Sequence, residues 1–358
     1  MSFLQSIALR IVRALGGFTL AQYLTRNRLR ILCYHGFSAG DEHALMPYMF
    51  MRASTFERRM RILEKRRVPV IPLDEAVRRL QTGDIRNAET VITLDDGWTS
   101  NLTIAAPILE KHGFPACIYV TTEHLSAGTE VFNVLLNYMI RSSGRDTLLL
   151  EGLHPDMDGV YELRRDPSGA AISLIIAAEK AFPALGDRQA LLTRIAAALG
   201  LDLAEVLTVD RFRLLNRDQI RELSERGFDI QLHTHTHRLP DQSFESMAPE
   251  IERNRAHLQS IVGPGRNHFC FPSGRYSSRH PAWLARLGIQ SATTCDSGLN
   301  APGSSNLLLK RYLDSDHLTD LQFEAVICGF NDMARNVRSS LNRLRATRSG
   351  ESVAVKTE

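Results

Sequence analysis

Two short stretches of the sequence combine residue types that could hold a metal ion. In the first, Asp95 and Asp96 stand side by side directly after the apolar run 91–94, and Gly97 follows them. Two adjacent carboxylates repel one another, so a bound cation would stabilise the pair. The alternative without function is a strand that ends in an ordinary Asp-Gly turn.

The second stretch is a cluster of histidines. His233, His235 and His237 are three of the 12 histidines in the chain, and they fall within five residues. Histidine is the commonest metal ligand in proteins. An extended backbone would put all three side chains on one face, whereas a helical turn would pair only His233 with His237. A solvated loop rich in His and Thr is the alternative without function.

Taken together, the two stretches have the composition of a hydrolytic metal site. Two imidazoles and one carboxylate form a three-ligand set that leaves an open position for water. A second carboxylate that does not bind the ion would be free to take a proton from that water. This division of labour would give Asp95 and Asp96 different roles.

Both stretches follow apolar runs that predict strands, and these runs alternate with segments of helical periodicity. The predicted helix at 54–67 would be capped by Ser54 or Thr55, with Glu57 completing a capping box. Alternating strands and helices predict a parallel sheet or an α/β barrel, in which ligands gather at the carboxyl ends of the strands. Strands are expected at 30–35, 68–71, 90–94, 115–121, 228–232, 268–271, 288–293 and 307–313, and the other helices at 73–81, 100–112, 218–226, 244–261 and 281–287.

The alternation breaks off at about 128–210. Segments with helical spacing at 131–141, 170–182 and 187–199 surround a loop rich in Gly, Pro and Asp at 151–169. We predict a helical insertion that starts after the carboxyl end of a strand and therefore shapes the substrate cleft. The expected organisation is an N-terminal amphipathic helix (1–28), a barrel (29–330) that contains this insertion, and a C-terminal helical tail (331–358) that frays.

Composition and charge restrict the class of protein. With 44% hydrophobic and 23% charged residues, the 358-residue chain resembles an ordinary globular protein, and a net charge of +3 gives no reason to expect binding to nucleic acid. The five cysteines show no metal-site spacing, so we read them as reduced, which favours the cytoplasm.

The first 25 residues have helical apolar spacing, but Arg10 and Arg13 interrupt it. These charges argue against a cleaved secretory signal and against a membrane span. The helix is therefore expected either to dock on the surface of its own domain or to make peripheral membrane contact.

The motifs resemble those of the polysaccharide deacetylase family, which has a NodB-homology domain of the carbohydrate esterase family 4 type. Residues 93–97 (Thr-Leu-Asp-Asp-Gly) are similar to its first motif, 233–237 (His-Thr-His-Thr-His) to its second, and 271–276 (Phe-Pro-Ser-Gly-Arg-Tyr) to a variant of its third. Tyr34-His35 looks like the end of the family's opening strand. The resemblance implies a distorted (β/α) barrel and metal-dependent removal of acetyl groups from N-acetylated or O-acetylated sugars.

The resemblance also implies roles for individual residues. Asp96, His233 and His237 would hold a divalent ion (zinc, or cobalt or nickel), and Asp95 would be the general base. The backbone after Pro272, at the N–H of Ser273, would help to form an oxyanion hole, and we expect both residues to contact substrate. His35 is expected at the same rim against the substrate, and His317 is the candidate general acid, with an ordinary surface histidine as the alternative.

One departure from the family's pattern affects the base. The family usually carries an Arg two residues before the Pro of its third motif, and this chain has Cys270 there. That Arg commonly orients the catalytic Asp, so Asp95 needs another partner. Two other functions therefore stay open: a hydrolase of a cyclic imide or another non-sugar amide, and a silent carbohydrate-binding homologue. Retention of both acids and both histidines argues against the silent homologue.

The insertion has features of its own that bear on a sugar substrate. Its loop carries charged residues that suit hydrogen bonds to sugar hydroxyls, although such residues more often belong to a plain solvated loop: Asp156, Asp158, Arg164, Arg165 and Asp166.

Overall fold

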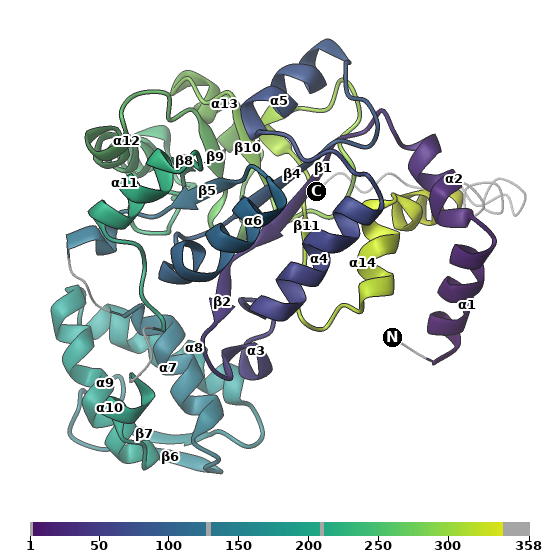
Figure 1. Cartoon of the computed structure of the whole chain (residues 1–358). Coiled ribbons are helices and arrows are strands. Elements are labelled where there is room, and N and C mark those ends of the chain that lie inside the picture. The colour runs from purple at the N-terminus through teal and green to yellow at the C-terminus, as the bar shows by residue number, and fades with distance from the viewer. Residues whose placement is uncertain (1–2, 127–129, 208–210, 339–358) are drawn as a thin grey trace, which may run out of the picture.

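The computed structural model describes residues 3–126, 130–207 and 211–338, with a parallel sheet at the centre (Figure 1). Seven strands lie in the order β10-β9-β8-β5-β4-β1-β11, and every neighbouring pair is parallel. All residues of β1 and β4 are buried, as expected for a sheet that helices cover. The strands are β1 (Arg30–Tyr34), β4 (Thr90–Leu94), β5 (Cys117–Val120), β8 (Asp229–Leu232), β9 (His268–Cys270), β10 (Ser291–Thr293) and β11 (Tyr312–Leu313).

The segment 309–313 connects the two edges of this sheet. Leu309 forms a parallel bridge with Thr293 at the end of β10, and three residues later Tyr312 pairs with Leu32 of β1. The sheet therefore curls on itself, and the distorted (β/α) barrel predicted from the motifs is confirmed. Arg311 lies inside this connecting segment, between the two points of contact.

Helices cover the outside of the curled sheet (Figure 1). The inner faces of most of these helices and the strands form one hydrophobic cluster, which includes Phe56, Leu109, Ile220 and Ile251. The buried side chains of 73–80 pack instead in a separate cluster with Ile31 and Val91. The covering helices are α4 (Ala53–Lys65), α5 (Leu73–Thr82), α6 (Ala106–His112), which follows a π-helical turn at Asn101–Ala105, α11 (Arg217–Glu225), α12 (Phe244–Val262), α13 (His280–Arg286) and α14 (Asp320–Ile327).

Two local predictions in this region are wrong. Helix α4 has Arg52 as its N-cap without a side-chain cap of its own, so the capping box from Ser54 and Glu57 does not form. The expected strand at 68–71 is reduced to a single bridge between Val70 and Thr90. A small parallel pair that the pattern did not indicate, β2 (Gly36–Ser38) with β3 (Phe50–Arg52), flanks the short helix α3 (Glu42–Leu45).

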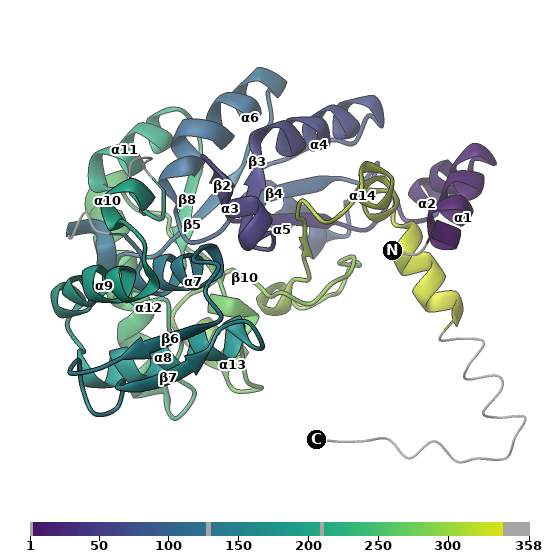
Figure 2. The ribbon, with the colours of Figure 1, turned by 90° about the horizontal axis from the view of Figure 1, so that it is seen from below.

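Residues between β5 and α11 form a separate lobe (Figure 2). Its helices pack around a second hydrophobic cluster, which also takes in Phe50 and Trp98 from the barrel side. The lobe consists of α7 (Phe132–Ser142), β6 (Thr147–Leu150), β7 (Gly159–Glu162), α8 (Pro167–Ala181), α9 (Leu185–Leu199) and α10 (Leu203–Val206).

The predicted loop at 151–169 is partly wrong, because β7 lies within it and pairs antiparallel with β6. Two of its acids already have partners inside the lobe. Asp158 accepts hydrogen bonds from the backbone N–H groups of residues 152–154, and Asp156 lies 2.8 Å from the Lys180 ammonium.

The N-terminal segment forms two helices, α1 (Phe3–Ala14) and α2 (Gly17–Leu24), which lie beside α14 (Figure 1). Gly16, with φ at 77°, joins them, and the pair bends by 73°. Among the described residues no single helix has the length and apolar character of a membrane span, although the bent pair has them when the two helices are taken together. At the other end, residues 330–338 are helical, and the rest of the predicted tail lies outside the described residues.

Candidate functional site

The carboxyl ends of four strands bring the candidate residues to one edge of the barrel. Asp95 and Asp96 follow β4, and His233 follows β8. His35 follows β1, and Pro272 comes two residues after β9. Since all these strands are parallel, their ends meet at the same rim, which is where α/β barrels carry their ligands.

Asp96, His233 and His237 form a cluster of possible metal ligands. The Nε2 atoms of His233 and His237 lie 3.2 and 3.3 Å from Asp96 Oδ1, and the three ligand atoms all lie within 4.8 Å of one another. His235 turns away from this cluster, because its Nδ1 lies 2.9 Å from Thr122 Oγ1 and its ring stacks on His257. The extended arrangement with three histidines on one face is therefore not formed.

The surroundings of the cluster fit it to bind a cation. His233 Nδ1 lies 2.9 Å from the Cys270 carbonyl oxygen, which requires a proton on Nδ1 and leaves the Nε2 lone pair free. The indole N–H of Trp98 donates to Asp96 Oδ2 at 2.9 Å and so leaves Oδ1 facing the histidines. Burial alone would raise the pKa of Asp96, but its contacts with the rings of His233 and His237 outweigh burial and hold that pKa well below its usual range. Two imidazoles and an ionised carboxylate suit a divalent transition metal.

The backbone at the site is unusual. Asp96, His237 and Ser273 have positive φ angles of 71°, 57° and 54°, and Thr234 has one of 61°. These four are half of the eight non-glycine residues with positive φ in the described part of the chain. Such conformations cost energy and tend to gather at functional sites, where the fold holds a side chain at a required angle.

Asp95 has a partner that the sequence did not indicate. Both guanidinium Nη atoms of Arg311 contact its carboxylate, at 2.7 Å to Oδ1 and 2.8 Å to Oδ2. Both side chains are buried, and Arg311 also donates to Thr93 Oγ1 and to the carbonyl oxygen of Thr294. Burial would raise the pKa of Asp95, but the Arg311 guanidinium outweighs it and holds that pKa well below its usual range. Arg311 thus makes the contact with Asp95 that the resemblance led us to expect from an Arg at position 270, where this chain has Cys270.

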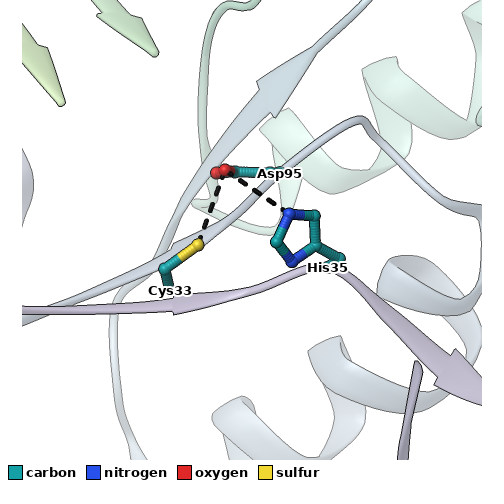
Figure 3. Close-up of side chains that lie close together, drawn as sticks. All are labelled: Cys33, His35 and Asp95. Carbon is teal, nitrogen blue, oxygen red and sulfur yellow. Dashed lines mark hydrogen bonds and ion pairs between the residues drawn. The ribbon is translucent and has the colours of Figure 1, made fainter. Parts of the chain in front are cut away.

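Three further side chains surround the Asp95 carboxylate. The thiols of Cys33 and Cys270 lie 3.5 and 3.3 Å from Oδ2. His35 Nε2 lies 3.9 Å from the same oxygen, and Figure 3 shows Cys33 and His35 converging on it from β1 and the residue after β1. All five cysteines are free thiols, and burial raises the pKa of Cys33 and of Cys270 far above the usual range, so both stay protonated and can donate.

The remaining predicted site residues differ in their positions. Ser273 lines the same cavity as Asp96 and His237, directly after Pro272. His317 is exposed on the loop after β11, where its ring packs against Tyr48 at a centroid distance of 5.5 Å. Among the described contacts, none joins His317 to either acid of the site.

Residues 191–292 match the family model described as polysaccharide deacetylase. This part of the chain is similar to the polysaccharide deacetylase family. The matched range includes His233 and His237, while Asp95 and Asp96 precede it. Enzymes of this family hydrolyse carbon–nitrogen bonds other than peptide bonds in acetylated carbohydrates and use a divalent metal, which agrees with the Asp/His/His cluster.

Solved structures with a similar fold carry related names. The Streptococcus pyogenes deacetylase PplD, in complex with acetate, has a TM-score of 0.57 at 15% identity, over 84% of this chain and 98% of that one. IcaB from Ammonifex degensii has a TM-score of 0.54 at 17% identity, over 84% and 97%. The putative polysaccharide deacetylase BA0330 from Bacillus anthracis has a TM-score of 0.51 at 17% identity, over 84% and 69%. No curated protein matches the chain.

Proposed function

We propose that this protein removes acetyl groups from a carbohydrate in a metal-dependent hydrolysis, with Asp95 as the general base. One observation carries the proposal: an ionised, buried Asp95, held by Arg311, stands beside the Asp96/His233/His237 cluster. The two adjacent acids then have different roles, as a hydrolytic site requires.

Asp96, His233 and His237 would hold the ion, which when bound lowers the pKa of water and polarises the acetyl carbonyl. The Asp95 carboxylate takes the proton of the attacking water. Arg311 contacts both carboxylate oxygens, so it fixes the orientation of Asp95 during this transfer. The backbone N–H of Ser273 donates to the oxygen that becomes negatively charged.

His35 is the proposed proton donor to the departing sugar nitrogen. Its Nε2 lies 3.9 Å from Asp95 Oδ2, and its side chain remains 20% exposed, so a substrate can reach it. His317 was the candidate from the motifs, but its packing against Tyr48 on an exposed loop gives less support for that role.

We propose zinc as the ion, because a site of two histidines and one carboxylate with an open position is typical of catalytic zinc. Cobalt and nickel share the same ligand preferences and stay alternatives. The test is acetate release from a set of acetylated glycans by metal-stripped protein reloaded with Zn²⁺, Co²⁺ or Ni²⁺. Metal-dependent acetate release supports the proposal.

Two outcomes of this screen would favour other functions. Turnover of cyclic imides or simple amides, with none on sugars, would make the protein a hydrolase of non-sugar amides. Sugar binding without turnover under every metal would make it a silent homologue, and the proposed role of Asp95 would then be wrong.

We further propose that the protein works in the cytoplasm and that α1 and α2 contact the surface of an anionic membrane. Seven large apolar side chains between residues 4 and 24 are exposed, from 38% at Ile7 to 82% at Leu15. The first acidic residue of the chain is Asp41, so the exposed Arg10 and Arg26 give the segment a positive charge, whereas Arg13 is paired with Glu324 of α14 at 2.9 Å. Apolar faces flanked by arginine suit a surface of anionic lipid.

A further inference from the structure

A cavity of about 630 Å³ opens at the candidate site and runs between the barrel rim and the inserted lobe. Asp96, His237 and Ser273 line its barrel side. Asn133 of α7, Glu179 of α8 and Arg188 of α9 line the side formed by the lobe. The cavity has room for more than the one sugar ring that carries the acetyl group.

The lobe side of this cavity holds polar atoms that lack a partner within the described protein. Arg188 is only 7% exposed, yet its Nε has no hydrogen-bond partner. Its other contacts are weak: Nη2 lies 3.4 Å from the Pro183 carbonyl oxygen, and Nη1 lies 3.7 Å from Glu179 Oε1. Asn133 Oδ1 and His124 Nδ1 are also buried without a partner, and both residues line the cavity.

These atoms come from three different elements and offer both kinds of hydrogen bond. The Nε–H of Arg188 can only donate, and Asn133 Oδ1 can only accept. Burial, reinforced by the charge of Arg188, lowers the pKa of His124 to about 4, so its neutral ring can donate from one nitrogen and accept at the other. Buried polar atoms are nearly always satisfied, so a polar ligand is expected here.

The charges on this wall indicate which polar ligand fits. Glu179 is already bound, by the Asn133 amide at 3.1 Å and by the Arg238 guanidinium at 2.6 Å. Glu123 also lines the cavity and would repel an anionic group. A hydroxyl both donates and accepts, so a ring with several hydroxyls matches the mixture of donors and acceptors, whereas a phosphate or carboxylate does not.

We propose that Arg188, Asn133 and His124 form a subsite for a second, neutral sugar ring next to the acetylated one. The substrate is then a glycan of at least two sugars rather than a monosaccharide, and the inserted lobe selects it. This inference rests on the proposed deacetylase function for the orientation of the acetylated ring.

The test compares acetate release from N-acetylglucosamine with release from its β-linked disaccharide and trisaccharide. For the wild-type protein we expect kcat/KM to be about tenfold or more higher on the disaccharide, within the range that one well-placed polar contact provides. Arg188→Gln should remove most of this advantage, mainly by raising KM for the disaccharide. Arg164→Gln, an exposed arginine of the same lobe that pairs with Asp146, is the matched control and should behave as wild type.

A binding measurement separates failure of the subsite from failure of the proposed function. Calorimetric titration of the Asp95→Asn protein with the two sugars needs no turnover and should show the same preference for the disaccharide. Asn133→Ala, on a different helix, should weaken that preference if Arg188→Gln does not fold. Equal affinity for the two sugars would overturn the subsite. So would an equal loss of the disaccharide preference in Arg188→Gln and in Arg164→Gln. Disaccharide preference without any acetate release would instead overturn the deacetylase function alone.

Discussion

At the scale of single residues, the pair of Asp95 and Arg311 explains how a buried carboxylate can serve as a base. Burial disfavours the ionised form, and only ionised Asp95 can accept a proton. Two charge-assisted hydrogen bonds from one planar guanidinium restore that form and fix its orientation. Asp96 receives the corresponding stabilisation from two histidines, so the two adjacent acids have different partners.

Substituting Asp95 should separate catalysis from metal binding. We expect Asp95→Asn to lower kcat by roughly 10²–10⁴-fold, the usual loss for a missing general base, and to retain the metal. His237→Ala should lose both, since its Nε2 belongs to the ligand cluster. Metal content by atomic emission, measured beside acetate release, checks the pair. An equal loss of metal in the two variants would show that the roles of the two acids have been assigned wrongly.

Arg311 offers a test of orientation rather than of chemistry. Arg311→Lys keeps a charge beside Asp95 but loses the bidentate geometry, so we expect kcat to fall about tenfold or more with KM and metal content little changed. In Arg311→Gln, which also loses the charge, kcat should fall further. If both variants raised KM and lost metal together, Arg311 would be supporting the barrel as a whole and not the base.

The ligand residues could be predicted from the sequence because strand ends and spacing place them locally. Arg311 could not, because it reaches Asp95 from 216 positions further along the chain. Its position depends on how the segment 309–313 joins β10 to β1, which is a property of barrel closure and not of any motif. The one signal was a pair of basic residues, Lys310 and Arg311, in a predicted strand at 307–313 that is otherwise apolar.

At the scale of elements, helix α4 is capped from the far end of the chain. Asp316 Oδ2 accepts from the backbone N–H of Arg52, the N-cap, at 2.7 Å, and Oδ1 accepts from Thr55 Oγ1 at 2.5 Å. The capping box expected from Ser54 failed because this tertiary contact takes its place. Asp316→Ala should therefore lower the free energy of unfolding by about 1 kcal/mol, as for a lost N-cap.

The same contact predicts a dependence on pH. Burial opposes ionisation of Asp316, but the hydrogen bonds from Thr55 and Arg52 outweigh it and lower the pKa below its ordinary value. A carboxyl whose pKa is lowered by folding stabilises the protein above its unfolded pKa and loses that effect as pH falls through the folded pKa. Urea unfolding of wild type and Asp316→Asn should thus differ at neutral pH and converge below about pH 4. A constant difference across that range would contradict this account.

Substitutions in the segment of α1 and α2 can show whether its exposed apolar surface binds lipid. Leu4, Ile11 and Leu15 are 77, 53 and 82% exposed. Replacing all three with Glu should lower binding to phosphatidylcholine vesicles that contain phosphatidylglycerol by about a hundredfold, from lost apolar burial and added negative charge. Co-sedimentation measures this, with activity on a water-soluble glycan expected to stay unchanged.

The matched control lies on α8, where Ile172 and Ile176 are 57 and 62% exposed. Replacing both with Glu should leave vesicle binding intact. Equal effects of the two sets, or a wild-type protein that ignores the vesicles and dimerises instead, would reject the membrane surface and indicate contact with a second copy.

The helices and strands could be predicted from sequence periodicity well in the barrel and less well in the lobe. In the barrel β1, β4, β5 and β9 are buried along their whole length, and helices with a clear apolar side separate the strands. The hairpin of β6 and β7 is mostly exposed on one face, and apolar and polar residues alternate in it only briefly. The sequence pattern therefore predicts a loop where β7 forms. The turn between β6 and β7 is held by local contacts, such as the hydrogen bonds that Asp158 accepts from the backbone N–H groups of Gly152 and Leu153. Sequence periodicity carries no signal for such contacts.

At the scale of the whole molecule, the barrel and the inserted lobe have largely separate hydrophobic clusters. The ligand residues follow β4 and β8, which pack within the barrel cluster. The lobe reaches the site at the cavity that both line, and through Trp98, which packs in the lobe cluster and donates to Asp96. Formation of the metal site and recognition of the substrate should therefore be separable, with the first belonging to the barrel and the second to the lobe.

Removing most of the lobe tests this separation. We would replace residues 143–206 with a short flexible linker and retain α7, because its buried side chains pack in the same cluster as Phe50 and Trp98 of the barrel side. The variant should bind one metal ion as wild type does, since no candidate ligand has been removed. Loss of Glu179 and Arg188 from the cavity wall should raise KM on an oligosaccharide about tenfold or more, with a smaller effect on a monosaccharide. Unchanged KM would mean that the lobe does not contribute to substrate binding, and loss of the metal would mean that the barrel cannot form its site alone.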